Sequence, residues 1–143
     1  MKNQFYKKFQ LYQLAVIFSL LFSLVGFSYN VWRMEISEEN NNIRTACFEM
    51  LINLSSLEQL IYTAYYDGNT LESSPRIGWV KVGLIGDLSA LTDQSVEKSS
   101  TILKASWSAH WNTLTTNQDS VDALVIAIDS VRTEIKGLLT SLE

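Results

Sequence analysis

The sequence predicts an all-α protein with one N-terminal transmembrane helix followed by an extracytoplasmic antiparallel four-helix bundle. Three observations predict this fold class. A long apolar stretch lies near the N-terminus, apolar residues recur with helical spacing through most of the remainder, and the chain has one proline and six glycines. With 143 residues, of which 47% are hydrophobic, the chain is long enough for one modest core after the membrane segment.

Residues 11–32 form the expected membrane anchor, and residues 1–10 form a basic tail before it. The stretch is apolar apart from Gln13, Asn30 and a few serines. A helix needs roughly 20 apolar residues to span the hydrocarbon core of a bilayer. Trp32 at the far end suits the membrane interface, where amphipathic rings are enriched.

The charges on the two sides of this stretch predict its orientation. Lys2, Lys7 and Lys8 are the only charged residues before it, whereas eight Lys or Arg and fifteen Asp or Glu follow it. The positive-inside rule then places the N-terminus in the cytoplasm. We expect a single-pass protein of the bacterial inner membrane with a periplasmic C-terminal domain. The acidity of that domain argues against binding to nucleic acid.

A cleaved signal peptide is the alternative interpretation of the same stretch. Gly26 and Ser28 are small residues that a signal peptidase could accept, although Phe27 separates them. Cleavage near Ser28 would leave a soluble periplasmic protein. The length of the stretch and the lack of an Ala-x-Ala motif favour a retained anchor, and both interpretations put the domain on the same side of the membrane.

The domain after the anchor is expected to form the bundle over residues 43–143. Its predicted helices cover about 43–66, 75–92, 95–116 and 119–142. The polar run at 33–42 is either a linker or a continuation of the membrane helix, and continuation is favoured because the run holds no helix breaker. Short links between helices favour an antiparallel up-down-up-down order.

Apolar spacing of three and four residues predicts the buried seams of three helices. The first seam is Ile43, Cys47, Met50, Leu54, Leu57, Ile61 and Ala64. The third helix contributes Val96, Ser100, Leu103, Trp107, His110 and Leu114. The fourth has the most regular seam, with Val121, Leu124, Ile128, Val131, Ile135, Leu138 and Leu142.

The second helix is the least distinct, because the Val and Gly content of residues 76–86 also suits a strand. Asp67-Gly68-Asn69 is expected to end the preceding helix, and Ser74 and Pro75 to start this one as N-cap and first residue. Helical spacing predicts a seam of Ile77, Val80, Leu84, Leu88 and Leu91. Gly83 and Gly86 would let a neighbouring helix approach closely.

Antiparallel order would gather most of the domain's tyrosine and tryptophan at its membrane-distal end. Aromatic rings with a few polar groups are typical of a site for a small ligand or a partner protein. The residues of this candidate site are Tyr62, Tyr66, Arg76, Trp79, Trp107, His110 and Trp111. The alternative is that the rings close the end of the bundle. The Arg76 guanidinium suits a carboxylate or phosphate, or an ion pair with Asp67.

The composition excludes several kinds of site. A single cysteine, Cys47, rules out an internal disulfide and a cysteine-based metal site, and a single histidine, His110, rules out a multi-histidine site. Cys47 is expected to be a small core residue or, alternatively, to form an intermolecular disulfide. No catalytic or phosphate-binding motif is present. We therefore expect no enzyme activity, no cofactor and no metal.

The layout of residues 1–142, with a basic tail, a membrane helix and a four-helix outer domain, resembles the outer sensing domains of bacterial chemoreceptors and sensor kinases. In those receptors the fourth helix continues into a second membrane helix and an output domain. Here Leu142 and Glu143 end the sequence. A sensor of this form would signal only through another protein.

Three functions fit these expectations. The first is a small membrane protein whose outer bundle binds a partner protein, or a second copy of itself, as a non-catalytic accessory or regulatory subunit. Outward-facing seam residues such as Cys47 or Ser100 would support this function. The second is a sensor-like module that binds a small ligand at the aromatic end. The third is an exported immunity or chaperone-type protein.

Overall fold

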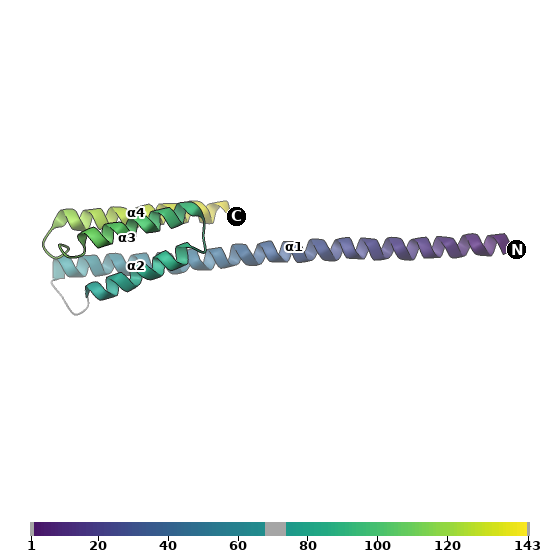
Figure 1. Ribbon diagram of the computed structural model, residues 1–143, viewed down its shortest axis with the longest axis horizontal. Helices are drawn as coiled ribbons and strands as arrows, with labels where there is room; N and C mark the ends of the chain where they lie inside the picture. Colours follow the sequence, from purple (N-terminus) through teal and green to yellow (C-terminus); the bar gives the residue numbers. More distant parts are fainter. Residues whose placement is uncertain (1, 68–73, 143) are drawn as a thin grey trace. The chain divides into compact units, whose positions relative to one another are not determined.

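The computed structural model describes residues 2–67 and 74–142, with side chains from Phe9 onward, and this part of the chain has four α-helices and no strand (Figure 1). The predicted loop from Gly68 to Ser73 lies outside the described residues. The elements are α1 (Lys2–Tyr62), a π-helical turn η1 (Thr63–Asp67), α2 (Pro75–Ser89), α3 (Gln94–His110) and α4 (Gln118–Ser141). The segment for which a strand was the alternative is helical.

The chain divides into an N-terminal unit, residues 1–39, and a bundle unit, residues 40–143. The described residues of the N-terminal unit all belong to α1, and its described apolar side chains are exposed. From Phe9 onward α1 is long and apolar enough to cross a membrane. The polar run at 33–42 is also helical and continues α1, as the sequence favours.

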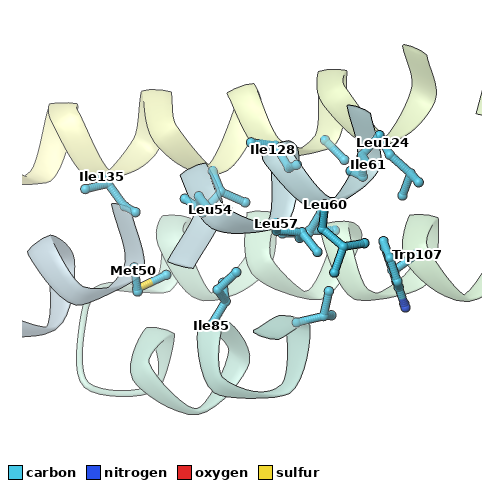
Figure 2. Close-up of a cluster of buried hydrophobic side chains, with 14 of the residues drawn as sticks. Met50, Leu54, Leu57, Leu60, Ile61, Ile85, Trp107, Leu124, Ile128 and Ile135 are labelled. Carbon is cyan, nitrogen blue, oxygen red and sulfur yellow. The ribbon is translucent and has the colours of Figure 1, made fainter. Parts of the chain in front are cut away.

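The bundle unit has one hydrophobic core, to which all four helices contribute. The seam predicted for α1 is confirmed from Cys47 to Ala64, and the seams predicted for α3 and α4 are buried over most of their length. Figure 2 shows leucines and isoleucines of α1 and α4 pointing into the same interior, with Ile85 of α2 and Trp107 of α3 beside them. Burial of these side chains is the main stabilising contribution to the unit.

Two groups of polar contacts join α1 to α4 beside this core. Arg132 forms a 2.6 Å ion pair with Glu58 and a 3.1 Å ion pair with Asp129. Burial alone would lower the pKa of Arg132, but hydrogen bonds to both carboxylates outweigh it and raise that pKa, so the guanidinium stays charged. Near the start of the bundle unit, Arg44 donates a 2.6 Å hydrogen bond to the backbone oxygen of Leu142.

Helix α3 ends earlier than the sequence predicts. The expected helix reached residue 116, whereas α3 stops at His110 and residues 111–116 form consecutive turns. Thr113 and Thr116 each donate a side-chain hydrogen bond to the backbone oxygen three residues earlier. Such local bonds compete with the helical ladder, which explains the early end. Asn117 then caps α4 by accepting a hydrogen bond from the backbone of Asp119.

The buried face of α2 is not the one that the sequence predicts. Of the predicted seam, Ile77, Val80, Leu84 and Leu91 are exposed, and only Leu88 packs partly against the core. The residues that α2 buries instead are Gly78, Val82, Ile85 and Ser89. Their spacing of four, three and four is equally helical, so periodicity alone could not choose between the two faces.

Contact between Gly78 and Trp107 explains why α2 turns this face inward. An ideal Cβ on Gly78 would lie only 2.0 Å from Cζ2 of Trp107, so the indole occupies the space of the missing side chain. The Trp107 side chain is fully buried there and meets Trp79 edge-on, with 6.5 Å between ring centroids. Gly83 and Gly86, which were predicted to allow the close approach, have nothing within 4 Å of a Cβ.

The contact between Gly78 and Trp107 predicts how alanine substitutions at two glycines of α2 change the free energy of unfolding. We expect Gly78→Ala to lower the free energy of unfolding by about 1–3 kcal/mol, because a Cβ cannot fit unless Trp107 or α2 moves. Gly83→Ala is the matched control, and it should raise the free energy by about 0.5–1 kcal/mol because alanine favours helix and the space is open. Denaturation of the full-length protein in mild detergent, followed by circular dichroism, measures both. Equal effects of the two substitutions would contradict the packing described.

Candidate interaction surface

The structure distributes the predicted site residues over separate places on the bundle unit. Tyr62 and Tyr66 line a shallow groove on α1 and η1. Trp107 and Trp111 line a small cleft between helices. The other three residues, Arg76, Trp79 and His110, line neither the groove nor the cleft. Tyr62 and Tyr66 therefore share one feature and Trp107 and Trp111 another, and Trp79 meets the second through the ring of Trp107.

The groove on α1 and η1 is open and is lined by both polar and aromatic side chains. Besides the two tyrosines, its lining residues are Ser55, Glu58, Gln59, Thr63 and Asp67. The Tyr62 hydroxyl donates to Glu58 at 3.3 Å, and its pKa is raised by burial first and then by the Glu58 charge. Tyr66 meets the ring of Tyr65 edge-on, with 4.9 Å between ring centroids. A groove this open leaves a small molecule mostly in water, unlike typical ligand pockets.

The cleft beside Trp107 is smaller but more enclosed, with a volume of about 140 Å³. It is mostly apolar, and its lining residues are Leu60, Ala64, Pro75, Trp107, Trp111, Leu114 and Thr115. Its volume is close to that of an apolar cavity that accepts benzene, about 150 Å³. Trp107 is nevertheless first a core residue, since its side chain is fully buried. Its Nε1 has no acceptor among the described residues.

His110 is a linking residue between the end of α3 and the start of α4. Its Nδ1 lies 3.3 Å from the hydroxyl of Ser120, and that hydroxyl is 2.9 Å from the hydroxyl of Thr113. Ser120 is buried, so these contacts satisfy a polar group inside the bundle. Among the described residues, no three His, Cys, Asp or Glu side chains are grouped as a metal site would need.

Cys47 and Ser100 both face inward, so neither gives the outward seam position that would have supported partner binding. The Cys47 side chain is completely buried. Burial, and secondly the Asp93 charge, raises the pKa of its thiol, which keeps it protonated and unreactive. Cys47 therefore acts as a small core residue in the structure, as one of the two interpretations from the sequence has it.

The largest apolar feature of α2 is on its outside. Ile77, Val80 and Leu84 form one stripe, here called the outer α2 face, with exposed fractions of 41%, 70% and 42%. It lies opposite the buried face of the same helix, because residues three and four apart share a side of an α-helix. A surface helix normally has one apolar side and one polar side, whereas α2 has two apolar sides.

Sequence reasoning identified these three residues but assigned them to the core. The missed signal is that α2 carries two apolar stripes of equal regularity, one large and one built around a glycine and a serine. Larger side chains usually mark the buried stripe. Here Trp107 supplies the bulk from the facing helix, so the stripe of small residues is the buried one.

Comparisons with protein-family models, with curated proteins and with solved structures found no match for this chain.

The two tryptophans of the cleft should differ sharply in their effect on stability. We expect Trp107→Ala to lower the free energy of unfolding by about 3–5 kcal/mol, as for other large core residues. Trp111 is 37% exposed, so Trp111→Ala should lower the free energy of unfolding by less than Trp107→Ala does. Thermal denaturation of the two variants compares them, and a larger loss for Trp111→Ala would contradict the assignment of Trp107 to the core.

Proposed function

We propose that this protein is a single-pass membrane protein whose helical bundle binds a partner protein as a non-catalytic accessory or regulatory subunit. The observation that carries the proposal is the outer α2 face, which leaves three large apolar side chains in water on a helix whose other side is already packed. Exposed apolar stripes of this kind are typical of protein interfaces.

The N-terminal unit supports a membrane anchor. It contains a helical stretch of sufficient length and apolarity, and none of that stretch is buried by other parts of the chain. Large exposed apolar surface is unfavourable in water and favourable in lipid, where the helix satisfies its own backbone hydrogen bonds. The three lysines before the stretch support a cytoplasmic N-terminus and a periplasmic bundle at the bacterial inner membrane.

We further propose that the helices of the bundle unit run up and down in antiparallel order. Contacts between α1 and α4 support this order. Arg44, early in the bundle unit, bonds to Leu142 near the end of the chain, whereas Glu58, later in α1, pairs with Arg132. As the residue number increases along α1, the residue number of its partner on α4 decreases. This is the pattern expected of antiparallel neighbours.

Native mass spectrometry of the tagged, full-length protein, purified from its own membranes in mild detergent, tests the proposal. We expect an intact chain of 16.2 kDa plus the tag, which indicates a retained anchor. We also expect a stoichiometric partner, either another protein or a second copy. A chain shortened near Ser28 would instead indicate a cleaved signal peptide.

A pair of matched variants tests whether the outer α2 face carries the contact. Val80→Lys places a charge in the middle of that face, and Ile126→Lys places one on α4 at a residue with the same exposed fraction, 70%. Because both side chains are already in water, neither variant should unfold the bundle. We expect Val80→Lys to reduce recovery of the partner by at least about tenfold and Ile126→Lys to leave it unchanged. Loss of the partner in both variants, or in neither, would contradict the proposal.

The cleft beside Trp107 favours a second candidate function, the binding of a small apolar ring compound. Its volume of about 140 Å³ and its apolar lining suit a ligand the size of benzene. Thermal shift with benzene and indole as probes should show stabilisation of the wild-type protein and loss of that stabilisation in Trp111→Ala. This variant is preferable to Trp107→Ala, which would disturb the core. No shift with either probe would exclude this candidate for ligands of that class.

A further inference from the structure

Helix α1 has a second regular stripe on the side opposite its buried seam. The whole stripe is exposed and is here called the outer α1 face; it consists of Thr45, Phe48, Ile52, Ser55, Gln59, Tyr62 and Tyr66. Phe48, Ile52 and Tyr66 have exposed fractions of 57%, 63% and 66%. Because the members are alternately three and four residues apart, they lie along one side of the helix.

The outer α1 face has the pattern of a helix that packs against another helix. None of its seven side chains is charged. The open groove described above lies on the same side, since Ser55, Gln59, Tyr62 and Tyr66 line it, and the rings of the two tyrosines are 6.1 Å apart between centroids. An alternating spacing of three and four residues over three heptads is the repeat of a coiled-coil seam. Nothing in the described part of the chain covers this seam.

A shared membrane restricts how two copies of this face can meet. The apolar stretch precedes the bundle unit in the chain, so α1 leads away from the membrane segment in both copies. Two copies anchored with the same orientation are related by a two-fold axis perpendicular to the membrane. Their α1 helices are then parallel, and each residue of the outer α1 face lies opposite the same residue of the second copy.

Charges at the edges of the face favour the parallel pair. In a parallel coiled coil, a residue on one edge lies near the residue five positions later on the facing edge of the other helix. Arg44 and Glu49 have this spacing and lie on opposite edges, so Arg44 meets Glu49 of the second copy, and the symmetry makes the contact twice. Glu49 forms no ion pair among the described residues, and Arg44 uses one nitrogen in its bond to α4. The next edge pairs bring no like charges together, since they join Leu51 to Ser56 and Glu58 to Thr63.

We propose that the outer α1 face binds the same face of a second copy of this chain, in parallel and in register. Phe48, Ile52 and Tyr62 pack against their counterparts across the axis, and the second copy covers the groove. The proposal rests on the membrane anchor proposed above and goes beyond the accessory function, since it leaves the outer α2 face free for a different partner. A contact along about six turns of one helix is small for proteins in dilute solution, but a shared membrane raises the effective concentration of the two copies.

Disulfide formation at the seam tests the register in the full-length protein. Ser55→Cys places two thiols opposite each other across the axis, within the distance that a disulfide spans. Membranes that contain the variant are treated with copper phenanthroline in air, remaining thiols are blocked with N-ethylmaleimide, and covalent dimers are measured on a non-reducing gel. We expect at least about fivefold more dimer than from Ser108→Cys, the same substitution at an exposed position of α3. The wild-type protein controls for Cys47, which is buried.

A matched pair of isoleucine variants measures the strength of the association. Full-length copies with a donor or an acceptor dye on a C-terminal tag are reconstituted in phospholipid vesicles, and energy transfer between them gives a dissociation constant. Ile52→Lys places two like charges against each other across the axis and should weaken self-association at least about tenfold. Ile126→Lys, at an exposed position of α4, should leave it unchanged. Both side chains are already in water, so both variants should fold, which circular dichroism verifies.

The outcomes separate this inference from the proposals made above. Equal amounts of covalent dimer from Ser55→Cys and Ser108→Cys, or equal effects of Ile52→Lys and Ile126→Lys, overturn the pairing. If Val80→Lys weakens self-association and Ile52→Lys does not, the second copy binds at the outer α2 face, so the accessory function stands and the α1 pairing is wrong. If Ser55→Cys forms dimers in a chain that has been shortened near Ser28, the pairing stands and the anchor is wrong.

Discussion

Packing of the Trp107 ring into the space above Gly78 is the contact on which the rest of the bundle depends. The indole is the largest fully buried side chain, and it lies where α2, α3 and the late part of α1 come together. A tightly packed core of mainly leucine, isoleucine and valine has room for such a ring only where a neighbouring position has no side chain. Gly78 is that neighbour, so it fixes which side of α2 faces inward.

The orientation of α2 then determines the surface of the molecule. Because Gly78, Val82 and Ile85 face the core, Ile77, Val80 and Leu84 must face outward. Their exposure is therefore a consequence of core packing. The same rotation leaves Gly83 open. One buried contact thus links the stability of the bundle to the surface proposed to bind a partner.

Polar contacts have a more local role. The ion pair between Glu58 and Arg132 joins α1 to α4 at the rim of the core, where partial burial strengthens it relative to a fully exposed pair. The hydrogen bonds among His110, Thr113 and Ser120 satisfy a buried hydroxyl where α3 turns into α4. The second group fixes positions at a helix end, so His110, a residue of the predicted site, has a structural role.

The sequence by itself determined the helical class, the apolar N-terminal stretch and the buried seams of α1, α3 and α4. In the bundle part of each of those helices, one stripe of apolar residues repeats over most of the length, and that stripe is the buried one. Only the tertiary structure decided which face of α2 is buried and how the aromatic residues divide between groove, cleft and core. The reason is physical: α2 has two stripes of equal periodicity, and the choice between them depends on the shape of Trp107, which lies on another helix. Periodicity within one helix carries no information about the side chain that will pack against it.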